Sequence, residues 1–227
     1  MRLPLPAALL LATSVAACSE DPVVLVLDIT PGHETDAFSA APPVTRVDVT
    51  GASPEGDILV GASSAPGGTF DLGEVPEDRL LSFEVTGYDA SSAVAVRGRS
   101  LGVVIGAIDS EVLPIFAQRL GTWSRPPDAV GHAHVGGVAG VLGERYLLST
   151  GGQVAAGSSR TASAPAYYDL LTLAEAVGND FPRSAASLLL GVDGSTALLI
   201  DGQGATWVDF LNGSSSDVVL PAGLTSF

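Results

Sequence analysis

The chain has 227 residues, of which 46% are hydrophobic, and its ten basic residues leave a formal net charge of −15. This apolar fraction is too high for a disordered chain and predicts a folded protein with one large domain or two small ones. The acidity excludes nucleic acids and anionic membrane surfaces as electrostatic partners, because their phosphates would repel the protein.

The N-terminal 17 residues have the pattern of a signal peptide. Arg2 supplies a positive charge, residues 3–17 form an apolar run that is too short to span a bilayer comfortably, and small residues precede Cys18, the only cysteine. The sequence therefore predicts an exported protein whose residues 1–17 are removed.

The four residues Val15-Ala16-Ala17-Cys18 resemble the lipobox of bacterial lipoproteins, with Val15 in place of the usual leucine. The resemblance implies that the Cys18 thiol receives a diacylglyceryl group and that residues 18–22 form a lipidated tether. Acyl chains anchor a protein because each buried methylene contributes about 0.8 kcal/mol. Ser19 resembles the residue that permits sorting to the outer membrane, so the expected location is the bacterial cell envelope, at the outer membrane. The alternative is a plain signal peptide with an incidental cysteine.

Residues 23–118 show short apolar or alternating runs separated by glycine, proline and serine, which is typical of an all-β domain. Their spacing predicts an immunoglobulin-like or transthyretin-like β-sandwich. The predicted strands are residues 23–29, 45–49, 57–61, 69–72, 80–88, 93–97, 102–108 and 111–116. With Cys18 lipidated, no disulfide can form, so packing alone must hold this fold.

The pattern changes near residue 119, and a second series of strands follows. Gly152 and Gly202 each come after an apolar run and lie about 50 residues apart, which is the length of a kelch repeat. The predicted strands are residues 135–141, 145–150, 167–171, 185–190, 196–200 and 207–211.

Residues 119–227 resemble about two kelch repeats, each of which forms one four-stranded blade of a β-propeller. The residues that carry the resemblance are Trp123, Pro126, His132, Gly151-Gly152 and Tyr168-Asp169. The chain departs from the family pattern because no tryptophan follows the tyrosine closely and the second repeat has no glycine pair. The alternative is a second small sandwich with incidental glycines.

Two blades do not close a propeller, which needs 4–8 of them. Three explanations are open: a truncated gene product, a fragment of a longer reading frame, or a half-propeller that self-associates through its open sheet edges. Truncation is the expectation, because self-completion would also demand matched ends.

The sequence holds no G-x-S-x-G nucleophile motif, no Walker phosphate loop and no H-E-x-x-H zinc motif. His132 and His134 would share one strand face, but a zinc site needs a third protein ligand and only Asp128 is near. We therefore predict no catalytic residue, no metal site and no cofactor. Three acidic residues could offer oxygen ligands to calcium, but without D-x-D-x-D-G spacing they are predicted to lie in a solvated turn: Glu74, Glu77 and Asp78.

These patterns favour a non-catalytic, membrane-anchored envelope lipoprotein that acts as a binding or scaffold module for a protein or a glycan. One alternative is a remnant or fragment of a larger kelch-containing secreted enzyme, and another is a purely structural envelope protein. Trp123, Tyr167 and Trp207 are candidate binding aromatics, although packing is the commoner role of such residues. The sequence does not identify the ligand.

Overall fold

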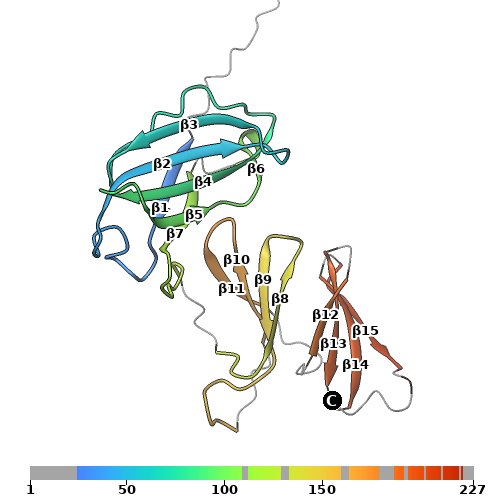
Figure 1. Ribbon diagram of the computed structural model, residues 1–227. Helices are drawn as coiled ribbons and strands as arrows, with labels where there is room; N and C mark the ends of the chain where they lie inside the picture. The colour runs from blue at the N-terminus through green and yellow to red at the C-terminus, as the bar shows by residue number, and fades with distance from the viewer. Residues whose placement is uncertain are drawn as a thin grey trace, which may run out of the picture.

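The computed structural model describes residues 25–108, 112–128, 133–159, 164–178, 187–191, 194–201, 203–210, 212–219 and 221. The predicted signal peptide, Cys18 with its tether, His132 and Gly202 lie outside these residues. Within them the fold is all-β, with strands β1 to β15, one short 3-10 turn and no α-helix (Figure 1). The predicted all-β class is therefore confirmed.

The N-terminal part of the chain forms one seven-stranded sheet with the order β1-β7-β5-β4-β2-β3, in which β6 also pairs with β4. Only β1 and β7 run parallel. The elements are β1 (Val26–Thr30), β2 (Val44–Ala52), β3 (Ile58–Ser64), β4 (Leu80–Asp89), β5 (Val94–Arg99), β6 (Val103–Val104), the 3-10 turn η1 (Ile105–Ala107) and β7 (Val112–Arg119).

This sheet curls around its core as a half-barrel (Figure 1). The curl brings the region of β1, at one end of the strand order, toward the chain that follows β3, at the other end. Among the described residues β1 pairs with β7 alone and β3 pairs with β2 alone. The curl therefore leaves an open seam between β1 and the chain that follows β3 instead of closing a barrel.

Strand β4 shows why the sheet has one apolar face. Leu81, Phe83 and Val85 alternate with more exposed residues, and all three are fully buried. They join buried residues of β2, β3, β5, β6, η1 and β7 in one core. Gly87, on the same strand, lies against Val44 and Val96, where an added Cβ would stand 3.1 Å from a side-chain atom of each, so a larger residue would crowd the core there.

One predicted strand is absent from the sheet. Residues 69–72 were expected to pair, but in the structure they form an extended segment outside every strand. The turn at Pro66 and Gly67 directs this segment across the seam, where Phe70 and Leu72 pack against the core with their side chains. Apolar packing thus places the segment without a ladder of hydrogen bonds.

The C-terminal part of the chain forms two four-stranded antiparallel sheets, each with its strands in chain order. The first contains β8 (Val138–Leu142), β9 (Tyr146–Thr150), β10 (Ala166–Asp169) and β11 (Ala174–Val177). The second contains β12 (Ser187–Leu190), β13 (Thr196–Asp201), β14 (Gly204–Asp209) and β15 (Ser214–Val218). The sequence predicted a strand close to each of these except β11 and β15, which it missed.

The two small sheets contact each other, and the turn after β10 contacts the curled sheet. Val138 of β8 packs against buried Leu199 and Val208 of the second sheet. The rings of Tyr167 and Phe210 meet edge to face, with centroids 6.2 Å apart. Leu171, in the turn after β10, packs against the core of the curled sheet.

Candidate binding cleft

The open seam of the curled sheet contains an apolar cavity of about 550 Å³, which we name the seam cleft. This volume falls in the range of ligand sites in proteins, about 300–1,000 Å³. No charged side chain lines it, and Thr69 contributes its only polar side chain. The lining residues are Leu25, Val26, Leu27, Ile29, Pro31, Phe38, Val47, Pro66, Gly67, Gly68, Thr69, Phe70 and Leu72.

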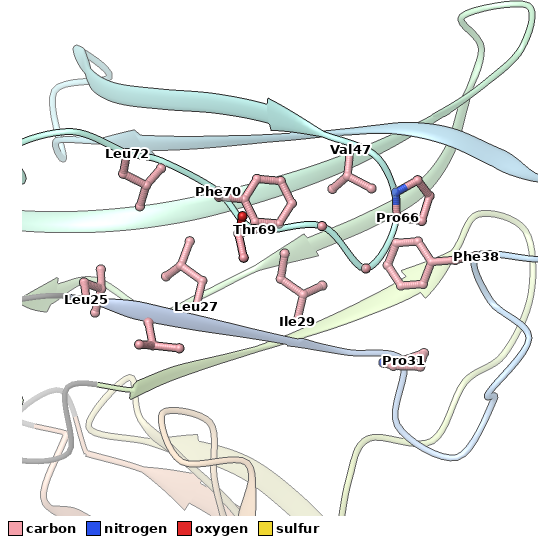
Figure 2. A pocket seen from close by; sticks show the side chains of 13 residues that line it. Leu25, Leu27, Ile29, Pro31, Phe38, Val47, Pro66, Thr69, Phe70 and Leu72 are labelled. Carbon is pink, nitrogen blue, oxygen red and sulfur yellow. The ribbon is translucent and has the colours of Figure 1, made fainter.

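Figure 2 shows the two walls of the seam cleft. Leu27 and Ile29 project from β1 into the space below the segment that follows β3, and Phe70 and Leu72 project from that segment (Figure 2). These side chains are partly buried and lie against the core. The cleft is therefore an extension of the core that opens to solvent along the edge of β1.

The seam cleft continues into a second cavity of about 900 Å³, the acidic groove. The two cavities share Leu25, Phe70 and Leu72. Four carboxylate side chains and no basic side chain line the acidic groove: Asp71, Glu74, Glu77 and Asp78. A single continuous depression thus changes from apolar to negatively charged at the end where β1 begins.

Hydrogen bonds donated by two backbone N–H groups hold parts of the acidic groove in place. The Gly73 N–H donates to Asp71 Oδ1 at 3.0 Å, which closes a short turn. The Gly106 N–H, in η1, donates to the Glu77 carbonyl at 3.0 Å. The groove is therefore attached to the curled sheet through η1 on one side and through the side chains of Phe70 and Leu72 on the other.

The histidine pair considered from the sequence is described only in part. His134 Nδ1 lies 2.9 Å from the Gly151 carbonyl, and its Nε2 is buried without a hydrogen-bond partner. His132 lies outside the described residues. Within the described part of the chain, no group of three or more His, Cys, Asp or Glu residues is arranged to hold a metal ion. This includes the turn that carries Glu74, Glu77 and Asp78.

The three candidate aromatics have different surroundings. Trp123 is 99% exposed in the segment after β7. Tyr167 packs on Phe210, and burial raises its pKa to about 12. Trp207 on β14 is partly exposed. The structure therefore places only Trp123 entirely in solvent, and it brings none of the three into the seam cleft.

The kelch-like residues Tyr168 and Asp169 make structural contacts in the first small sheet. The Tyr168 hydroxyl donates to the Pro127 carbonyl at 2.8 Å, and burial followed by the charge of Asp128 raises its pKa to about 12. Arg145 donates two hydrogen bonds to Asp169, at 2.9 and 2.7 Å. Burial opposes ionisation of Asp169, but these bonds and one from the Leu171 N–H outweigh it and lower the pKa.

The seam cleft was not predicted from the sequence. Its two walls are about 40 residues apart along the chain, and only the curl of the sheet brings them together. The available signal was the run of apolar residues at 69–72, which lies close to the acidic residues Glu74 and Glu77. A strand pattern next to a charged turn does not by itself indicate a cavity.

No protein-family model matches this chain, and no curated protein sequence is significantly similar to it. The described residues include no helix with the length and hydropathy needed to cross a bilayer.

Proposed function

We propose that this protein is a non-catalytic binding module, displayed at the bacterial cell envelope on a lipid anchor at Cys18, that binds a partner protein in the seam cleft. The observation that carries the binding role is the open apolar cavity of about 550 Å³ at the edge of β1. Monomeric proteins bury most surfaces of this kind, and those left open commonly serve as binding sites.

The lining of the cleft favours a protein over a glycan as the ligand. A glycan presents many hydroxyl groups, which lose hydrogen bonds to water when they enter an apolar site. Thr69 is the only side chain of the seam cleft that could replace them. Apolar side chains of a partner protein have no such requirement, and their transfer from water contributes roughly 25 cal/mol per Å².

The finer architecture also belongs to this proposal. We infer that the curled sheet belongs to the immunoglobulin-like or transthyretin-like class and that the two small sheets are kelch-like blades. Each small sheet is a four-stranded antiparallel meander, as a blade requires. Gly151 and Gly152 after β9 both have positive φ, of 69° and 71°, a conformation that favours glycine.

Binding in the cleft is tested with a neutral, environment-sensitive dye such as Nile red and the full mature chain. We expect saturable binding that Phe70→Asp weakens at least about ten-fold, because the charge would enter an apolar site. Phe70 lies outside every strand, so the sheet keeps its pairing. Ile58→Asp is the matched control, because Ile58 is 68% exposed and does not line the cleft. If Phe70→Asp binds the dye as tightly as Ile58→Asp does, the proposal is contradicted.

The anchor is tested separately, by growing bacteria that express the full chain with an alkyne-tagged fatty acid. We expect the wild-type protein to carry the label and Cys18→Ser to carry none, with an intact mass equal to residues 18–227 plus the lipid for the wild type. An unlabelled wild-type protein would exclude the anchor and leave the binding role of the cleft intact.

A further inference from the structure

We propose that the seam cleft receives an extended segment of a partner protein whose apolar side chains fill the cleft and whose arginine or lysine side chains lie over the acidic groove. This inference rests on the binding role proposed above and specifies the chemistry of the partner. Three features of the site carry it: the edge of β1 that no described strand pairs with, the apolar lining and the carboxylates that follow.

The edge of β1 offers backbone groups to an added strand. Within the part of the chain that the structure describes, β1 pairs only with β7, in parallel register from Val26–Val112 to Thr30–Phe116. Alternate residues of a strand direct their N–H and C=O groups to opposite sides, so half of those of β1 are turned toward the seam. An extended peptide can pair with such an edge, which is a common mode of peptide recognition.

The side chains along this edge match an extended ligand. Leu25, Leu27 and Ile29 follow each other at every second position and line the seam cleft. A strand placed beside β1 has the same two-residue period, so its alternate side chains would meet this row. Phe70 and Leu72 would cover them from the opposite wall (Figure 2). A five-residue stretch, about 17 Å long, equals β1 in length.

The acidic groove selects the charge of the partner. Its four carboxylates lie at the end of the cleft where β1 begins, and no arginine or histidine lines either cavity. A basic side chain adjacent to the apolar stretch would be attracted there. The groove disfavours a free fatty acid, whose carboxylate would be repelled. It also disfavours a second copy of this chain, because each copy carries a net charge of −15.

The test uses the full mature chain and fluorescent eight-residue peptides in which six residues alternate apolar with threonine and two arginines or two glutamates are added at one end. We expect the arginine peptides to bind at least about ten-fold more tightly than the glutamate peptides at low salt, with a smaller difference at physiological salt. Placing the two arginines at either end reports the direction of the added strand, since the groove lies at the start of β1.

Two double variants test whether the acidic groove causes the preference for arginine peptides. Glu74→Gln with Asp78→Asn should reduce the preference for arginine, because Asp71 and Glu77 remain in the groove, and should leave dye binding unchanged, because neither substituted residue lines the apolar cavity. Glu55→Gln with Asp57→Asn, in the exposed turn between β2 and β3, is the matched control and should keep the preference. If the wild-type protein binds arginine and glutamate peptides with equal affinity, this inference is wrong. If it still binds the dye, the proposed function stands. If the wild-type protein does not bind the dye at all, both the proposed function and this inference are wrong.

Discussion

The curled sheet and the two small sheets hold their strands together in different ways. In the curled sheet, β4 is ten residues long, and one continuous core joins buried side chains from β2 through β7. In the small sheets the strands are four to six residues long, and the described core cluster between them contains two buried residues, Leu199 and Val208. The small sheets contain other buried side chains, such as Leu148 and Ile200, but their described core cluster is smaller and their strands are shorter.

This difference predicts unequal local stability. Regions with few buried apolar contacts open at lower free energy than a continuous core. The seam cleft belongs to the better-packed region, so a ligand would meet a preformed site at the edge of a stable sheet. The small sheets would open first under denaturant or at extreme pH.

The largest expected effect is at the centre of the curled sheet. Phe83 is fully buried on β4, and Phe83→Ala should lower the free energy of unfolding by about 3–5 kcal/mol through lost transfer energy and a residual cavity. Urea denaturation followed by far-UV circular dichroism measures the change. Ile58→Ala, at an exposed position of β3, should cost less than about 0.5 kcal/mol. Similar losses for the two variants would mean that the core does not hold the sheet.

The next effect separates the two regions. Leu199 on β13 is fully buried but belongs to a small cluster, so Leu199→Ala should cost about 2–3 kcal/mol, near the lower end for such truncations. Hydrogen exchange read by mass spectrometry should show faster exchange in β8–β15 and unchanged protection in β2 and β4. Faster exchange in β4 as well would mean that the whole chain unfolds as one cooperative unit.

The sequence predicted well those elements whose pattern is local. Residues 80–88 alternate between apolar and polar, and β4 extends from Leu80 to Asp89. By contrast, β11 (Ala174–Val177) has alanine and glutamate, which are poor strand formers, and it forms a strand because β10 offers it an edge. Residues 69–72 have strand-like composition but pair with no described strand, and Phe70 and Leu72 pack on the core with their side chains instead.

The candidate site was less predictable than the fold for the same reason. Glu74, Glu77 and Asp78 were recognised as an acidic turn, but their position beside an apolar cavity depends on the curl of the sheet. Curl is set by the twist and register of all the strands together. A single sequence shows which residues each segment contains, but it does not show which segments lie opposite each other in the folded protein.

A smaller effect concerns the ion pair of the first small sheet. Asp169→Asn should cost about 1 kcal/mol, because Arg145, its partner, is 40% exposed and solvent screens the pair. The folded pKa of Asp169 lies below the ordinary 3.8, so its contribution is complete above that pH and is lost as the pH falls through the folded value. Thermal unfolding at neutral pH and at about pH 3 should therefore show a smaller decrease in melting temperature on acidification for the variant than for the wild type. An equal decrease in melting temperature for the two proteins would exclude this ion pair as a cause of the lower stability in acid.

The smallest effect tests the connection between the segment after β7 and the first small sheet. Tyr168→Phe removes the hydroxyl that donates to the Pro127 carbonyl, and at neutral pH it should cost about 0.5–1 kcal/mol. Because the folded pKa of Tyr168 is raised from 10.0 to about 12, the wild-type contribution is complete below pH 10.0 and is lost as the pH rises through the folded value. The variant has no such group, so the stability difference should narrow in alkali. A constant stability difference across that range would show that Tyr168 titrates alike in the folded and unfolded chains. Any loss of stability in alkali would then have to arise at another group, first at Tyr167, whose pKa is also raised to about 12.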